Sequence, residues 1–279
     1  MAASESRPVL WHIVISHYNE KARWALEHKG VEHGRRAVSG GAHMPVALAL
    51  TRGRHRTFPV LELDGARIGD STAIIAALER RFPEPSLYPS DEAERRRALE
   101  LEDWFDEEVG PHMRLLAWHE LTRDRERLED LVATQVPAAT GRGRRLAAAG
   151  ARSFVNRRYG VDSEAAAELA RRKVAEALDR IESELDGDYL VGECFSVADL
   201  TAAALLYPIV MPPEGPRLPR GPEALERFGA SSPSGVPTAG SRTPTGGTAA
   251  PARWRQPRAE SASLPQARCF FSPTPLKNV

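Results

Sequence analysis

The amino-acid sequence predicts an α/β domain, then an all-α domain, then a C-terminal tail without regular structure. Between residues 8 and 82, short apolar runs bounded by turn residues alternate with helical patterns, which is typical of an α/β domain. From residue 91 to residue 228 the apolar residues recur at helical spacing only. Residues 229–279 carry eight prolines and no apolar period, so we expect them to be disordered.

The first predicted unit is a strand followed by a helix. Residues 9–15 form an apolar run that predicts a buried strand, and the next segment has a helical apolar face that ends at Gly30. Ser16 lies between them, where the first N–H groups of the helix lack partners and the helix dipole is positive. That position favours an anion such as a phosphate, a carboxylate or a thiolate. A serine that only caps its helix is the alternative that these residues leave open.

The second predicted unit is a β-hairpin followed by a helix. Residues 60–63 form a short apolar run, and Asp64-Gly65 is a strong signal for a tight hairpin turn. Residues 67–69 are the expected return strand. Asp70 or Ser71 then opens a helix whose apolar positions recur at helical spacing.

The second half of the chain is expected to be all-helical. Residues 83–90 are proline-rich and predict a linker between the domain of residues 8–82 and the domain of residues 91–228. The periodic segments predict a long helix over residues 91–131 with a kink at Gly110-Pro111, then helices over residues 163–185 and 196–210. Residues 134–160 are rich in Gly, Arg and Ala and predict no definite structure.

The sequence around Ser196 contains a complete N-terminal capping motif for the next helix. Ser196 is the expected N-cap, and Asp199, three residues on, can accept a hydrogen bond from the Ser196 N–H. Phe195 and Leu200 have the spacing of a hydrophobic staple across that cap. We interpret Asp199 as structural rather than catalytic.

The charge balance, the apolar stretches and the cysteine and histidine content argue against several classes of function. Lys plus Arg equals Asp plus Glu, 38 against 38, which does not favour a nucleic acid or a membrane as partner. The start of the chain does not resemble a signal peptide, and the longest apolar stretch is too short to span a bilayer. With only two cysteines, the chain is expected to be cytoplasmic. The eight histidines lack ligand spacing, so no metal is expected.

The tail differs in charge from the rest of the chain. It holds six basic residues and one acidic residue, a net charge of +5. We hypothesise that the reading frame has shifted near Phe228 and replaced a last helix. A natural disordered extension is the alternative.

Taken in order, these motifs resemble the cytosolic glutathione S-transferase family, of the serine/cysteine, bacterial-like type, over residues 8–228. The Ser16-His-Tyr-Asn19 segment is similar to a redox CxxC corner with serine at the first cysteine. Phe58-Pro59 resembles the family's cis-proline site, and Asp70-Ser71 resembles its Glu/Gln-Ser pair. The resemblance implies a thioredoxin-like N-terminal domain, an all-α C-terminal helical domain and a homodimer.

The resemblance also implies a chemistry for the first helix start. Ser16 would donate a hydrogen bond to the glutathione thiolate and is the expected catalytic residue. Asn19 could assist Ser16 in holding the thiolate or could cap the helix, and both readings stay open. The absence of cysteine from both positions argues against a disulfide reductase.

The same resemblance assigns the remaining contacts of glutathione. Phe58, before the expected cis-Pro59, would present its backbone to the cysteinyl part. Ser71 suits the γ-glutamyl carboxylate, and Asp70 suits the γ-glutamyl ammonium. His43, Arg52 and Arg54 are the candidates for the glycine carboxylate.

Three functions compete at this stage. The first is transfer of glutathione to a small hydrophobic electrophile. The second is a non-catalytic protein that binds glutathione or another ligand. The third is another glutathione-dependent reaction, such as isomerisation or dehalogenation. The electrophile is expected to bind between the domains, with Trp104, Phe105, Arg114 and Trp118 on or near its pocket. The alternative, which the aromatic stripe favours, is that these rings belong to the core.

Overall fold

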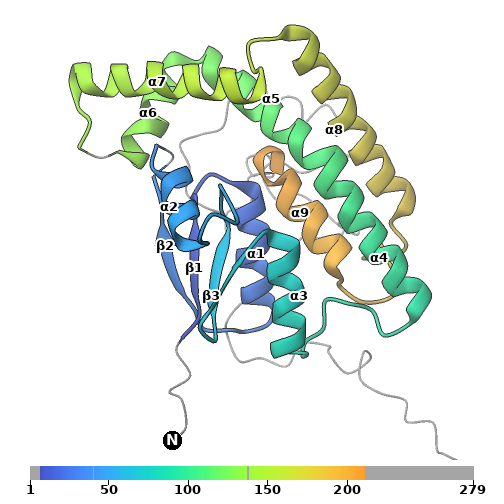
Figure 1. Ribbon diagram of the computed structural model, residues 1–279. Coiled ribbons are helices and arrows are strands. Elements are labelled where there is room, and N and C mark those ends of the chain that lie inside the picture. The colour runs from blue at the N-terminus through green and yellow to red at the C-terminus, as the bar shows by residue number, and fades with distance from the viewer. Residues whose placement is uncertain (1–6, 40, 137, 211–279) are drawn as a thin grey trace, which may run out of the picture.

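The computed structural model describes residues 7–39, 41–136 and 138–210, and it contains an α/β part followed by a helical part (Figure 1). The expected disordered tail at residues 229–279 and the expected frame shift near Phe228 lie outside these described residues. So does the end of the second domain, from residue 211 to residue 228.

The N-terminal part is a thioredoxin-like fold built on a four-stranded sheet in the order β2-β1-β3-β4. β1 pairs parallel with β2 and antiparallel with β3, and β3 pairs antiparallel with β4. The elements are β1 Val9–His12, α1 His17–His28, β2 Gly34–Ala37, α2 His43–Leu50, β3 Val60–Leu63, β4 Ala66–Gly69 and α3 Ser71–Arg81.

Alternation along the strands divides the side chains between two faces of the sheet. Leu10 and Leu61 are paired across β1 and β3 and are buried with α1 and α3. Trp11 and Val60 form the next pair and belong to a smaller cluster with α2. The sheet is therefore covered by α1 and α3 on one face and by α2 on the other (Figure 1).

The helical part begins with α4 Glu92–Trp104, which runs through a π-helical turn, η1 Phe105–Val109, into α5 Gly110–Arg123. The expected single helix over residues 91–131 is wrong at its end, because the backbone of Asp124 is extended and its carboxylate caps a separate α6. The later helices are α6 Arg125–Gln135, α7 Gly141–Tyr159, α8 Glu164–Glu184 and α9 Val197–Val210.

The capping box before α9 is present as predicted. The Ser196 N–H donates to Asp199 Oδ2 at 2.9 Å, and the Ser196 hydroxyl donates to the same oxygen at 2.8 Å. The other carboxylate oxygen accepts from the Leu190 N–H at 2.8 Å. Burial raises the pKa of the Asp199 carboxyl, against the lowering effect of these bonds.

One apolar core joins the two parts. It runs from α1 and α3 through α4 and α5 to α8 and α9. α9 lies in its centre, and among its described side chains Leu205 and Tyr207 are almost completely buried. The cavity described next is therefore fixed between two halves that share one core.

Candidate functional site

A cavity of about 1060 Å³ lies between the α/β part and the helical part. Six of the seven predicted site residues line it, and the seventh, Asn19, lies behind its wall. The six lie at the starts of α1, α2 and α3 and in the loop before β3: Ser16, His43, Phe58, Pro59, Asp70 and Ser71. Arg52 and Arg54, two of the candidates for the glycine carboxylate, do not line it.

Ser16 holds the N-cap position of α1, but its side chain makes no cap hydrogen bond. Its backbone is extended, and its carbonyl accepts from the N–H groups of Asn19 at 2.9 Å and Glu20 at 3.1 Å. The hydroxyl therefore remains available on the cavity wall, beside the positive end of the helix.

Asn19 connects two segments of the scaffold. Its Oδ1 accepts from the Ile13 N–H at 3.1 Å, and its Nδ2 donates to the Phe58 carbonyl at 3.2 Å. The side chain is buried, and both ends of the amide are occupied. Asn19 thus ties the end of β1 to the loop before Pro59, an arrangement that fits a positioning role.

The Phe58–Pro59 peptide bond is cis. Phe58 is buried in the smaller core cluster, which leaves its backbone at the cavity wall. Its carbonyl already accepts from Asn19, and a carbonyl oxygen has a second lone pair for a ligand.

Asp70, and not Ser71, caps α3, because its Oδ1 accepts from the Ala73 N–H at 3.1 Å. Asp70 has a φ of 78°, a backbone region that costs a non-glycine residue about 1–3 kcal/mol and is common at ligand sites. Ser71 follows as the first helical residue, buried and on the cavity wall.

A buried ionic cluster that the sequence did not indicate lies beside Ser71. Lys21 is fully buried, and its Nζ contacts Glu102 Oε1 at 2.8 Å and Asp106 Oδ2 at 2.5 Å. Thr72 links the two carboxylates, with its hydroxyl 3.1 Å from Glu102 and 2.9 Å from Asp106. Asp106 Oδ1 and Glu102 Oε2 are buried and have no hydrogen-bond partner among the described residues. Burial raises the pKa of the Glu102 carboxyl.

His17 and Tyr18 line the cavity, and burial moves the pKa of each side chain further from 7. Burial, with a smaller effect of the charge on Arg114, lowers the pKa of His17 to about 3. Burial also raises the pKa of Tyr18, whose hydroxyl donates to the Asp106 carbonyl at 2.8 Å. His17 is therefore neutral, and Tyr18 keeps its proton.

The far wall of the cavity comes from α5, α6 and α7. Arg114 and Trp118 lie on it as expected, but Trp104 and Phe105 do not. Phe105 is buried in the shared core, and the Trp104 ring packs against the Arg180 guanidinium at 4.1 Å. On the near side, the His43 ring meets the Phe154 ring of α7 edge-on at 5.9 Å.

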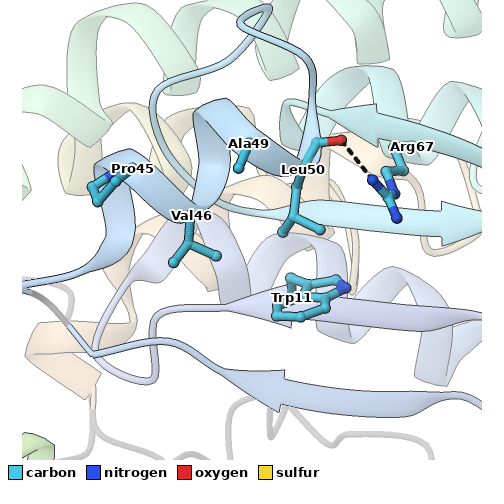
Figure 2. A pocket seen from close by; sticks show the side chains of 6 residues that line it. All are labelled: Trp11, Pro45, Val46, Ala49, Leu50 and Arg67. Carbon is cyan, nitrogen blue, oxygen red and sulfur yellow. Dashed lines mark hydrogen bonds between the residues drawn. The ribbon is translucent and has the colours of Figure 1, made fainter.

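A second, shallower hollow lies between α2 and β1 (Figure 2). Its volume is about 450 Å³, and apart from Arg67 its walls are formed by apolar side chains of β1 and α2. The Arg67 guanidinium is held by the Leu50 carbonyl at 3.2 Å. The larger cavity, with its polar groups from both halves of the molecule, is therefore the better candidate site.

Some classes of site are not found in the part of the chain that the structure describes. Over residues 7–39, 41–136 and 138–210, no group of His, Cys, Asp and Glu side chains could hold a metal ion. Within the same residues, no helix has the length and apolarity needed to cross a membrane.

Comparison with known proteins matches two parts of the chain to the two domains of one protein family. Residues 10–86 match the N-terminal domain of glutathione S-transferases, and residues 164–228 match the C-terminal domain of the same enzymes. The second match ends where the composition of the chain changes. No curated protein sequence matches the chain significantly.

Solved structures share the fold at low identity. The β-etherase LigF from Sphingobium sp. strain SYK-6 is 23% identical, with a TM-score of 0.55 over 74% of this chain and 85% of that one. A glutathione S-transferase from Rhodospirillum rubrum is 24% identical, with a TM-score of 0.52 over 85% and 93%. Rice GST1, solved with glutathione, is 20% identical, with a TM-score of 0.52 over 84% and 82%. With both of its domains matched in order, this chain belongs to the glutathione S-transferase family, whose members bind glutathione as a substrate.

Proposed function

We propose that this protein is a glutathione transferase of the serine type, in which the Ser16 hydroxyl stabilises the glutathione thiolate for attack on a hydrophobic electrophile. The observation that carries the proposal is the uncapped Ser16 hydroxyl at the start of α1, on the same cavity wall as cis-Pro59 and Ser71.

The energy required is within reach of these groups. A cysteine thiol has a pKa of about 8.5, and lowering it by about two units needs roughly 2.7 kcal/mol. A hydrogen bond to a charged group contributes about 1.5–3 kcal/mol, and a helix N-terminus contributes roughly 0.3–1 kcal/mol. Ser16 acts as a hydrogen-bond donor, and the thiol proton leaves to bulk water.

The remaining wall groups suit the other parts of glutathione. The Phe58 backbone pairs with the cysteinyl unit, and Ser71 with the start of α3 takes the γ-glutamyl carboxylate. Asp70 and Asp106, both on the cavity wall, offer negative charge to the γ-glutamyl ammonium. His43 takes the glycine carboxylate, since Arg52 and Arg54 do not line the cavity.

The test separates binding from catalysis. The purified full chain is applied to glutathione-agarose and eluted with free glutathione, and its turnover is then measured with 1-chloro-2,4-dinitrobenzene and a panel of other electrophiles. Retention and thioether formation support the proposal. Retention without any turnover would support the non-catalytic alternative, and turnover that leaves glutathione unconsumed would support isomerisation.

Family membership also leads us to propose a cytoplasmic homodimer. Light scattering coupled to size-exclusion chromatography measures the oligomeric state directly. A mass near twice 30.6 kDa supports the dimer, and a mass near 30.6 kDa contradicts it.

A further inference from the structure

Arg114 is a cation on the cavity wall that makes no hydrogen bond and no ion pair with any residue the structure describes. It lies on the face of α5 that also carries Pro111 and Trp118 to the cavity. Its guanidinium carbon lies 4.7 Å from the centre of the Tyr159 ring and 5.8 Å from that of Tyr18. Its Nε is buried and has no partner.

Among the described residues, no carboxylate on the cavity wall forms an ion pair with Arg114. Asp106 binds Lys21, Asp70 caps α3, and both are assigned to the glutathione ammonium. Asp103 and Glu107 are exposed to solvent, and neither forms an ion pair with Arg114. Within the described residues, nothing neutralises Arg114.

The surroundings of Arg114 also hold the guanidinium ready for a ligand. Cation–π attraction to the two tyrosine rings favours this position of the guanidinium without using its N–H groups. A guanidinium has five N–H donors, and donors that are withdrawn from water without a partner are costly. Trp118 and Leu121 on the same helix supply an apolar wall beside it, which suits the body of an organic molecule rather than a peptide backbone.

We propose that Arg114 selects acceptor substrates that carry a carboxylate, which it binds through paired N–H···O bonds while the apolar wall holds the electrophilic part. This inference rests on the proposed transferase function, because it names the acceptor class of the same cavity. The other carboxylates of the reaction, those of glutathione, are assigned to Ser71 and His43.

The reaction with a suitable probe is a simple displacement. With 4-chloro-3,5-dinitrobenzoate, the glutathione thiolate attacks the carbon that bears chlorine and forms a C–S bond. The C–Cl bond breaks, and chloride leaves with the bonding electron pair. The thiol proton has already passed to water, and the benzoate carboxylate stays intact on Arg114.

The test compares this probe with its uncharged methyl ester. For the Arg114→Gln variant, kcat/KM with the carboxylate is expected to fall about ten- to a hundredfold, as for the loss of a charge-assisted hydrogen-bonded pair. The value with the methyl ester should stay within about threefold. The Arg123→Gln variant is the matched control, since Arg123 lies on the same helix but pairs with Glu164 outside the cavity. Equal losses for both probes, or a raised KM for glutathione, would overturn the proposal.

A binding measurement keeps the inference testable if the proposed function fails. Quenching of tryptophan fluorescence, with Trp118 on the wall, reports binding of the unreactive 3,5-dinitrobenzoate and its methyl ester. Arg114→Gln is expected to weaken binding of the benzoate at least tenfold and to leave the ester unchanged. If Arg114→Gln does not fold, Arg114→Lys keeps the charge and should keep the preference for the benzoate. A wild-type protein that binds the ester as tightly as the benzoate would contradict the proposal that Arg114 selects carboxylates.

Discussion

Ser16 and Asn19 lie at the start of the same helix, yet their side chains have different contacts. The Asn19 amide bonds to Ile13 and to Phe58, while the Ser16 hydroxyl makes no cap bond. From sequence alone both residues could cap the helix, because serine and asparagine are both good N-caps. Only the position of the loop before Pro59, a long-range feature, decides between them.

The residue-scale prediction concerns Ser16→Ala. Turnover with 1-chloro-2,4-dinitrobenzene should fall about ten- to a hundredfold, since one hydrogen bond to a charged group, roughly 1.5–3 kcal/mol, is lost. The pKa of the thiol of bound glutathione, measured from thiolate absorbance against pH, should rise by about one to two units. Affinity for glutathione should change little, because the contacts of Phe58 and Ser71 remain.

Ser163→Ala provides the matched control for that experiment. Ser163 caps α8, where its hydroxyl accepts from the Ala166 N–H at 3.2 Å, and it does not line the cavity. Its loss should cost about 1 kcal/mol of stability and leave the thiol pKa unchanged. An unchanged thiol pKa in Ser16→Ala as well would remove Ser16 from the mechanism.

At the scale of elements, the sequence was sufficient to predict those strands, turns and helix starts that depend on residues close together in the chain. β1, the hairpin at Asp64-Gly65 and the capping box at Ser196 all follow from short-range rules. β2 and α2 had no such signal. β2 has the sequence Gly-Arg-Arg-Ala and is an edge strand of the sheet, and α2 is apolar on nearly every side. α7, which is rich in Gly, Arg and Ala, is a helix because it packs on α6.

The ionic cluster that joins α1 to α4 and η1 could not have been found from sequence, since its members are far apart in the chain. Lys21→Met leaves Glu102 and Asp106 buried without their cation. Such a change typically costs about 3–5 kcal/mol, and urea unfolding followed by circular dichroism measures it.

The control for the cluster is Lys173→Met. Lys173 is a partly exposed lysine of α8 that pairs with Glu108 at 3.4 Å and Glu176 at 3.5 Å. Because solvent screens such pairs, its urea midpoint should stay close to that of the wild type. A Lys21→Met protein as stable as this control would show that the cluster contributes nothing to stability.

At the scale of the whole molecule, buried neutral histidines make the fold sensitive to acid. Burial lowers the pKa of His17 to about 3 and that of His28 to about 4, from the value of 6.5 expected in the unfolded chain. Below pH 6.5 the unfolded chain therefore binds protons that the folded protein does not, and stability falls as the pH falls towards 4.

The expected slope is about 1.4 kcal/mol per pH unit for each such histidine. Urea unfolding at pH 7.5, 6 and 5 measures the total, and His28→Leu should flatten the slope by the share of one proton. His28 packs its ring on Phe195 and does not line the cavity, so the variant leaves the ligand site intact. A slope that is the same with and without His28 would contradict this assignment.

Asp106 belongs to two parts of the molecule at once, because its carboxylate holds Lys21 and the residue also lines the cavity. A cationic ligand group that binds beside Asp106 also stabilises the anion on which Lys21 depends. Occupancy of the cavity and attachment of the helical half to the sheet are then linked equilibria, so that each raises the other by the same factor. The protein would hold its two halves together most firmly when glutathione is abundant and loosen them as the tripeptide is depleted.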